Sequence, residues 1–401
     1  MSTDRALTFV VFGDDWGRHV SSMQHVISRL LDRVTVLWVN GIGHREPGLA
    51  DVRRAVTKVR AMLSDERRVS PVSTGPRPRE VIAPKVLPWH LNPAVARLNR
   101  WSLTRDVRRS IQRHAQGDVV LITGSPPSAG VVGRLGERAS IYFCMDDFLE
   151  LPGTSPRMMD VCERALLGRV DAVVATAARL VERKRSASGR GFYLPQGVNY
   201  EHFATPRLVP HELASLPRPI IGFAGGVGTA VDAATIRALA AANPTGSVVL
   251  VGSLTLAPAM VAAPNVHAFG PRPYAELPAY VQAFDVGIIP YVDNDWTRAV
   301  DPLKLLEYLA AGIPVVASPL PEVEKYRDVV RIAPLGDAFV RATMEAAFDV
   351  GSESRPRGRL VAKANTWEQR ADRFLEIVRD VVDSRAARPS TPVTPVLSGA
   401  A

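Results

Sequence analysis

The residues with the clearest chemical potential lie in one segment, Asp301-Pro-Leu-Lys-Leu-Leu-Glu-Tyr-Leu-Ala-Ala-Gly-Ile-Pro-Val-Val-Ala-Ser318. Lys304 and Glu307 are three residues apart, which makes them neighbours if the segment is helical. The free N–H groups and the dipole of a helix start attract anions, and a lysine beside them adds to that attraction. A glutamate one turn further along can accept hydrogen bonds from two vicinal hydroxyls. A diphosphate and a diol together occur in nucleotide sugars, so the segment predicts a site for such a molecule.

The order of residues in this segment predicts a loop, a helix and a buried strand. Pro302 suits the first helical position, where its missing N–H costs nothing. Leu305, Leu306 and Leu309 recur at helical spacing. Gly312 and then Pro314 end the helix, and residues 315–317 form a short apolar run typical of a parallel strand. The predicted helix start therefore lies directly before Lys304.

This segment resembles the donor-binding segment of the retaining GT-B glycosyltransferases, in the large glycosyl transferases group 1 type family that builds bacterial surface polysaccharides. The resemblance implies that Glu307 holds the donor ribose and that the helix start, with Pro302, Leu303 and Lys304, faces the diphosphate. The family pattern has another glutamate eight positions earlier, where this chain has Ala299. Asp295 or Asp301 is a candidate substitute for it.

Three further features are assigned to the donor side. In GFAGGVGTAVD, Gly225 and Gly226 follow a predicted strand, and we expect them to allow close approach of the backbone to the donor. The segment is not a complete GxGxxG, and the next strand ends without an acidic residue, so we exclude NAD and expect no cofactor. Arg272 follows another strand end and is, with Lys304, a candidate for the positive clamp on the diphosphate. Thr297, shortly before the predicted helix, completes the candidate donor residues.

Polar residues after two strands of the first half are candidates for the acceptor side. The turn FGDDWGRHVSS contains Asp15, Trp16 and Ser21, with His19 as a candidate catalytic residue. Helix capping by Asp15 or Ser21 is the alternative interpretation. In YFCMDDFLELPG, Asp146 is the preferred carboxylate for steering the acceptor hydroxyl and removing its proton, and Asp147 is the second choice. Capping of a following helix is again the alternative.

Apolar strands alternate with amphipathic helices along the chain, which predicts an α/β fold with parallel sheets. We expect two Rossmann-like domains facing across a cleft, the GT-B plan, with a C-terminal helix crossing back to the first domain. The predicted first-domain strands are 7–13, 33–40, 118–124, 139–145, 170–177 and 191–195, and the second unit opens at 218–226. The expected divisions are an acceptor domain 1–200, a linker near 196–217, a donor domain 210–366, a crossover helix 367–384 and a disordered tail 385–401.

Composition restricts the partners. The net charge of +9 permits a phosphorylated substrate or an anionic membrane, and no nucleic-acid-binding motif accompanies it. Two basic amphipathic segments, 51–63 and 94–113, are candidates for contact with an anionic membrane, although domain-core helices with solvated outer faces are the favoured interpretation. Two cysteines without CxxC spacing, scattered histidines and no DxD at a predicted sugar site argue against a bound metal. No signal peptide or membrane span is predicted, so we expect a cytoplasmic protein, at most at the inner face of the membrane.

The sequence thus predicts a retaining glycosyltransferase that moves a sugar from a nucleotide-diphosphate sugar to a glycan, lipid-linked or small-molecule acceptor. A sugar-nucleotide epimerase of the same fold is the first alternative. The second is a non-catalytic scaffold that binds nucleotide sugars, an interpretation favoured by Ala299.

Overall fold

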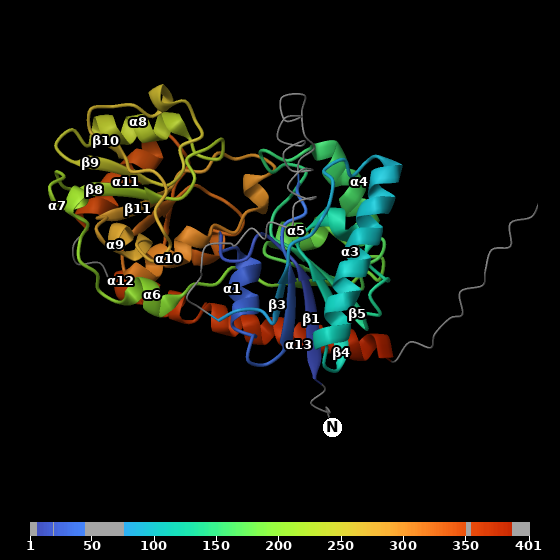
Figure 1. Ribbon diagram of the computed structural model, residues 1–401. Helices are drawn as coiled ribbons and strands as arrows, with labels where there is room; N and C mark the ends of the chain where they lie inside the picture. Colours follow the sequence, from blue (N-terminus) through green and yellow to red (C-terminus); the bar gives the residue numbers. More distant parts are fainter. Residues whose placement is uncertain (1–5, 19, 45–75, 350–353, 387–401) are drawn as a thin grey trace, which may run out of the picture.

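The computed structural model describes residues 6–18, 20–44, 76–349 and 354–386 and contains two parallel sheets, each flanked by helices (Figure 1). The seven strands of the first sheet run in the order β3-β2-β1-β4-β5-β6-β7. They are β1 (Leu7–Phe12), β2 (Thr35–Val39), β3 (Glu80–Ile82), β4 (Asp118–Thr123), β5 (Ala139–Cys144), β6 (Ala172–Ala175) and β7 (Gly191–Tyr193). The helices between them are α1 (Ser22–Ser28), α3 (Pro93–His114), η2 (Pro126–Gly130), α4 (Pro156–Leu167) and α5 (Ala178–Arg183).

The second sheet repeats this topology with six strands in the order β10-β9-β8-β11-β12-β13. They are β8 (Ile220–Ala224), β9 (Ser247–Val251), β10 (Val266–Ala268), β11 (Val286–Ile289), β12 (Val315–Ala317) and β13 (Arg331–Ile332). Its helices are α8 (Ala233–Ala242), η3 (Pro258–Met260), α9 (Leu277–Gln282), η4 (Thr297–Ala299), α10 (Leu303–Ala311), η5 (Glu324–Tyr326) and α11 (Asp337–Phe348). In both sheets the strand order reverses beside the first strand, and ligands bind outside the carboxyl ends of strands at such points.

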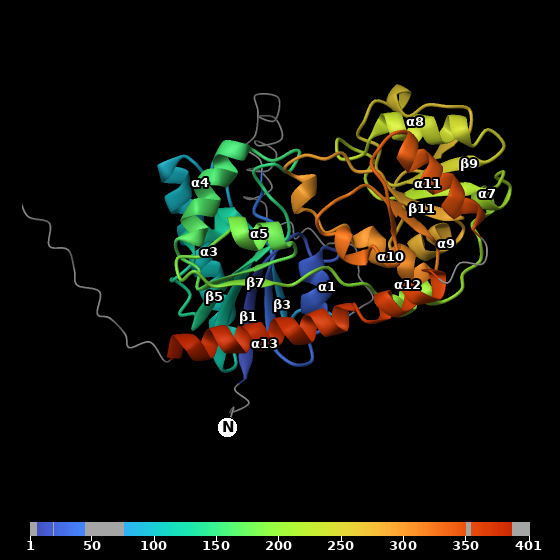
Figure 2. The same cartoon turned by 180° about the vertical axis from the view of Figure 1, so that it is seen from behind.

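The last two helices return the chain to the first sheet. Helix α12 (Ser354–Lys363) packs on α10 in the second domain, and α13 (Trp367–Ala386) then runs beneath the first domain (Figure 2). The apolar face of α13 completes a core with β1, β4 and β5, in which the Phe374 ring lies 6.4 Å from the Phe9 ring and 5.3 Å from the Phe143 ring. The prediction of two Rossmann-like units with a helix crossing back is confirmed.

Local details differ from the predictions. Residues 196–217 were expected to form a linker, but they contain the short helices α6 (Tyr200–Ala204) and α7 (His211–Ala214). Phe203 and Leu213 from these helices are buried in the core of the second domain, so the segment is part of its packing. Strands β3 and β13 were missed because three and two residues are too few to show a pattern.

Candidate functional site

The connections that leave the second sheet are held against the first domain. Asp295, in the loop between β11 and α10, forms an ion pair with Arg179 of the first domain at 2.7 Å. Asp301, at the end of the same loop, accepts a hydrogen bond from the Gln196 backbone N–H at 2.9 Å. Glu322, after β12, accepts one from the Ala178 backbone N–H at 2.7 Å. The two domains are therefore in contact through the loops that follow β11 and β12.

Helix α10 presents its N-terminal turn at this boundary. Pro302 lies at the N-cap, one residue before the predicted position, and Leu303 packs against the core of the first domain. Gly312 ends the helix with φ at 76°, a left-handed conformation that glycine adopts without a Cβ clash. The apolar side of the helix is buried in the second core, which fixes the direction in which the polar residues of its first turns point. The first N–H groups of such a helix have no intrahelical acceptor and attract an anion.

Glu307 is a buried carboxylate without a partner. Its residue is only 8% exposed, yet it forms no hydrogen bond or ion pair with any residue that the structure describes. Burial raises its pKa to about 7, and the nearby Lys304 ammonium reduces that rise. An unpaired polar group in this environment is costly for folding and is typical of a ligand site.

Lys304 lies in the first turn of α10, beside the helix start at which an anion would bind. Its ammonium donates to the Tyr291 hydroxyl and lies 4.7 Å from the centre of that ring and 5.0 Å from the Phe223 ring. It also lies against Gly225, where an added Cβ would come within 2.9 Å of the lysine Cε. Gly225 has φ at 143°, and the neighbouring Gly226 faces Ser253. The structure thus brings the glycine turn, Lys304 and the α10 start together.

Two other predicted donor residues are engaged elsewhere. The Arg272 guanidinium binds Glu212 at 3.0 Å and donates to the Tyr280 hydroxyl at 2.6 Å, contacts within the second domain. Thr297 is fully buried in a compact turn, where its hydroxyl and backbone exchange hydrogen bonds with Asn294. Neither the Arg272 nor the Thr297 side chain forms a hydrogen bond or ion pair with Lys304.

The position of the missing family glutamate is also accounted for. Ala299 is 1% exposed and belongs to the apolar core of the first domain. Asp295 and Asp301, the two candidate substitutes, are both used in the contacts between the domains described above. Through these contacts the loop holds the two domains together.

On the opposite wall, Asp146 lines a cavity of about 190 Å³ at the carboxyl ends of β1, β4 and β5. Burial raises the pKa of Asp146 to about 6, the Trp296 indole of the second domain lowers it, and Asp14 and Asp147 raise it further. A carboxylate with such a pKa is ionised at neutral pH and able to take up a proton.

Asp147 points away from that cavity. It is 2% exposed and pairs with Arg183 at 2.8 Å and Lys184 at 2.9 Å. Lys184 also binds Glu163 at 2.7 Å, and the Tyr142 hydroxyl donates to the same glutamate at 2.7 Å. The adjacent carboxylates therefore have different surroundings, and those of Asp147 are typical of a structural ion-pair network.

The predicted residues of the first turn are dispersed. Ser21 caps α1, its hydroxyl accepting from the Gln24 N–H at 3.4 Å, which is the alternative considered for it. Asp15 pairs with the exposed Arg18 at 3.6 Å. The Trp16 ring packs edge-on against Trp38, with 4.8 Å between the ring centres. His19 and the basic segment 51–63 lie outside the described residues.

Three further polar residues line the cavity: Asp14, His44 and Ser125. Asp14 belongs to the predicted polar turn FGDDWGRHVSS, whereas His44 and Ser125 were missing from the prediction. His44 lies 3.2 Å from the Ser125 hydroxyl, and burial lowers its pKa, an effect that Asp14 opposes. Each follows the carboxyl end of a strand, β1, β2 or β4, so the rule that selected Asp146 could have found them.

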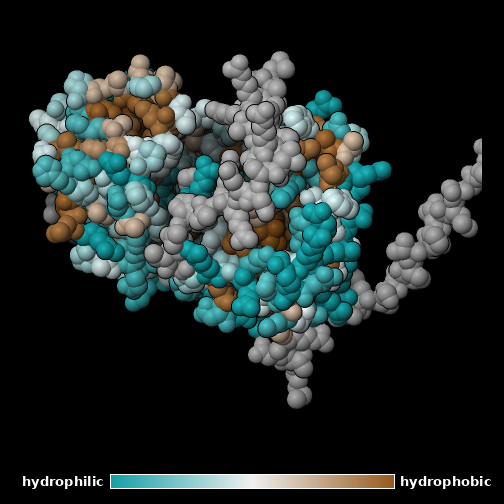
Figure 3. Space-filling model, in the orientation of Figure 1, coloured by the Kyte–Doolittle hydropathy of each residue, from teal (hydrophilic) through white to brown (hydrophobic). Residues whose placement is uncertain are grey.

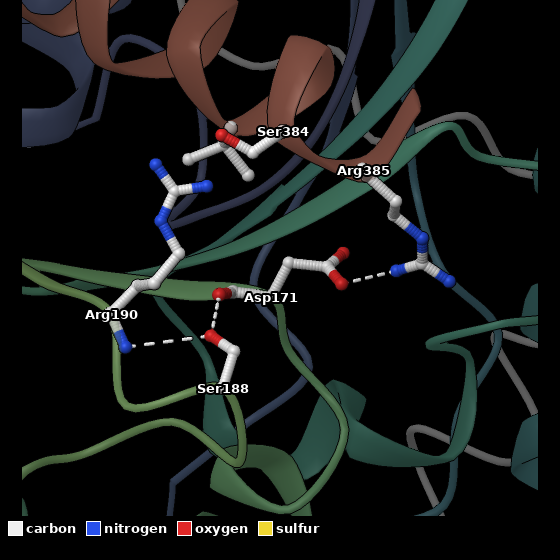
Figure 4. A pocket seen from close by; sticks show the side chains of 6 residues that line it. Asp171, Ser188, Arg190, Ser384 and Arg385 are labelled. Atoms are coloured by element: carbon white, nitrogen blue, oxygen red, sulfur yellow. Dashed lines mark hydrogen bonds and ion pairs between the residues drawn. The ribbon is translucent and has the colours of Figure 1, made fainter. Parts of the chain in front are cut away.

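A separate cavity of about 240 Å³ lies between the end of α13 and the start of β6 (Figure 4). Its charges are already neutralised, since Arg385 pairs with Asp171 and Arg190 pairs with Asp380. The amino end of a parallel strand is not where such sheets bind ligands. We therefore place the functional site at the domain boundary.

Among the described residues, no group of three or more His, Cys, Asp or Glu side chains has an arrangement suited to a metal ion.

Comparison with known proteins shows which family the second domain resembles and which fold the chain has. Residues 218–347, which contain the glycine turn, Lys304 and Glu307, match the sequence profile of the family Glycosyl transferases group 1. The sequence of the second domain is therefore similar to that family. A 180-residue segment is 30% identical to TuaH of Bacillus subtilis (strain 168), a protein named as a teichuronic acid biosynthesis glycosyltransferase. That match spans 42% of this chain and 45% of TuaH, so less than half of that relative is represented.

Solved structures show the same fold over nearly the whole chain. Sucrose-phosphate synthase from Thermosynechococcus elongatus superposes with a TM-score of 0.67 at 16% identity, covering 95% of this chain and 100% of that one. Anabaena Alr3699/HepE, solved in complex with UDP-glucose, gives a TM-score of 0.65 at 12% identity, covering 93% and 99%. These likenesses establish the GT-B fold for both domains.

Proposed function

We propose that this chain is a retaining glycosyltransferase that uses a nucleotide-diphosphate sugar. The observation that carries the proposal is Glu307, a buried carboxylate one turn from Lys304 and the start of α10 that has no hydrogen-bond or ion-pair partner among the described residues. Two ribose hydroxyls would donate to that carboxylate, and the helix start with Lys304 would bind the diphosphate. The relatives named for glycosyl transfer, and those solved with UDP-glucose, support this reading.

In the proposed reaction, the bond between the sugar C1 and the diphosphate oxygen breaks, and its electron pair goes to the diphosphate. The α10 N–H groups and Lys304 stabilise that charge as it develops. The acceptor oxygen forms the new bond to C1, and its proton passes to the Asp146 carboxylate. Donor and acceptor would thus be held by opposite domains, with the acceptor being a glycan, a lipid-linked sugar or a small molecule.

A non-catalytic role in binding nucleotide sugars is the second candidate, because Ala299 stands where the family has a glutamate and is buried against the first domain. Slow hydrolysis of the donor without acceptor separates the two, since only an enzyme would show it. The same assay with an acceptor detects transfer.

We also propose that the protein works at the inner, anionic face of a membrane, through α3. Arg97, Arg100 and Arg109 form no ion pair with any described carboxylate, so their charges are available. Trp101 and Leu98 on the same helix are 57% and 49% exposed, and Arg105 stacks over Trp101 at 4.5 Å. The surface around α3 is largely hydrophilic (Figure 3), and arginine with tryptophan suits a lipid headgroup region. No helix among the described residues is long and apolar enough to cross a bilayer.

The test of the donor site is binding of a panel of nucleotide sugars, starting with UDP-glucose, to the wild type and to Glu307→Ala. We expect the variant to stay folded and to bind the donor about 1.5–3 kcal/mol more weakly, the range for charge-assisted hydrogen bonds. Glu345→Ala, which removes an exposed carboxylate from α11 of the same domain, is the matched control and should bind normally. Equal affinity of Glu307→Ala and the control would remove the donor-site assignment.

A further inference from the structure

A second polar group at the domain boundary is poorly satisfied. The indole N–H of Trp296, in the β11–α10 loop, is buried and makes no hydrogen bond of regular geometry with any described residue, although it lies near enough to Asp146 to affect that carboxyl. A buried donor without an acceptor costs free energy, and inside a cleft it marks a place where a ligand oxygen can bind.

The loop holds Trp296 over the first domain. Asp295, directly before it, pairs with Arg179, and Ala299, three residues after it, is buried in the first core. The indole acts on the Asp146 carboxyl, since it lowers the pKa of that group, although the two make no hydrogen bond of regular geometry. The donor domain thus contributes a hydrogen-bond donor next to the cavity that Asp146 lines.

An acceptor atom placed between these groups must satisfy both. The indole can only donate a hydrogen bond, and a carboxylate can only accept one. A hydroxyl has one proton and two lone pairs, so it can accept from Trp296 and donate to Asp146 at the same time. A protonated amine has no lone pair for the indole, and an anionic group would be repelled by Asp146 and by Asp14 in the same cavity.

We propose that Trp296 is an acceptor-binding residue, whose indole N–H holds the hydroxyl oxygen that Asp146 deprotonates. This inference rests on the proposed glycosyl transfer and restricts its acceptor to a neutral alcohol. The indole keeps its proton throughout: the hydroxyl proton goes to Asp146 as the oxygen bonds to C1 and the diphosphate leaves. The other ionisable groups near Asp146 are Asp14, Asp147 and His44, which stay the same in the test below.

The test compares Trp296→Phe, which removes the N–H and keeps an aromatic ring, with Trp89→Phe, a matched change at an exposed tryptophan. For Trp296→Phe we expect the acceptor KM to rise at least 10-fold. The acid limb of the pH profile of kcat/KM should move to higher pH, because the indole lowers the pKa of Asp146. Donor affinity and acceptor-free donor hydrolysis should stay within about two-fold of the wild type. Trp89→Phe should change none of these.

An unchanged acceptor KM and pH profile in Trp296→Phe would overturn the proposal, and so would a parallel loss of donor affinity. A carbon-13 NMR titration of the Asp146 carboxyl, assigned with Asp146→Asn, tests the contact without activity. We expect its pKa to be higher in Trp296→Phe than in the wild type, and equal values would overturn the contact. Absence of transfer by the wild type would instead reject the proposed function. The titration needs no enzyme activity, so it tests the contact between Trp296 and Asp146 in either case.

Discussion

Two buried carboxylates, one in each domain, differ in what surrounds them. Asp147 is 2% exposed and binds two cations, one of which is shared with Glu163. Glu307 is 8% exposed and binds no described residue, and its pKa is raised to about 7. Burial alone therefore does not mark a functional carboxylate, because Asp147 is the more deeply buried of the two. The missing partner is the distinguishing feature, and under the proposed function it leaves the hydrogen-bonding capacity of Glu307 for a ligand.

The comparison predicts that Asp147→Asn affects stability most. The substitution takes one of two carboxylates from the buried Lys184 and removes the carboxylate that pairs with Arg183, and we expect a loss of about 3–5 kcal/mol in the free energy of unfolding. Denaturant unfolding measures this directly. Asp146→Asn, at the next residue, is the control and should lose little stability, since Asp146 has no cation partner in the described structure. Equal losses at both positions would break the distinction drawn here.

Glu307→Gln should remove a dependence of stability on pH that the wild type has. A folded-state pKa of about 7 against an ordinary 4.5 means that the folded protein keeps a proton that the unfolded chain releases between those pH values. The wild type should therefore lose stability as pH rises through this window, by about 3 kcal/mol relative to Glu307→Gln, and little more above it. Unfolding of both proteins at pH 4.5, 6 and 7.5 measures the difference. Asp146 and Asp301 also have raised pKa values but are present in both proteins, so their contributions cancel.

A difference between wild type and Glu307→Gln that stays constant from pH 4.5 to 7.5 would contradict the assignment. It would mean that the Glu307 carboxylate has a partner in the free protein. The two buried carboxylates would then belong to the same class.

Asp146→Asn tests the catalytic side of the comparison. The substitution keeps size and much of the hydrogen bonding but removes the proton acceptor, so turnover should fall roughly 100-fold or more. Donor affinity should barely change, because Lys304 and Glu307, the proposed donor-binding residues, belong to the other domain. Steady-state kinetics and donor titration measure the two effects separately. Near-normal turnover would mean that Asp146 has no catalytic role. A loss of donor binding would mean that Asp146 belongs to the donor site and not to the acceptor site.

Sequence patterns predicted the fold well because most strands carry their own apolar run, the short β3 and β13 being the exceptions. The segment 301–318 was predictable for the same reason: its proline, leucines and glycine act locally on one helix and one strand. The ion-pair partners of these side chains were not predictable from the sequence. Asp146 and Asp147 are adjacent and identical in type, and nothing in the sequence around them indicates that Lys184, 37 residues from Asp147, pairs with only one of them. Contacts between the domains, such as Asp301 with the Gln196 N–H, depend on how two separately folded units dock.

The smallest effect is expected on α3, where the comparison between partnered and unpartnered charge extends to the surface. Arg113 on this helix pairs with Glu80 at 2.9 Å, whereas the exposed Arg97 pairs with no described carboxylate. An unpaired arginine near an anionic bilayer contributes about 1 kcal/mol, so Arg97→Gln should weaken binding to vesicles containing anionic lipid roughly 5-fold. Arg341→Gln, an exposed arginine of α11, is the control for net charge and should have a smaller effect. Vesicle flotation at low and high salt measures both, and high salt should release the wild type because exposed charges are screened. Equal binding to neutral and anionic vesicles, or equal effects of the two substitutions, would show that α3 is only a solvated helix face.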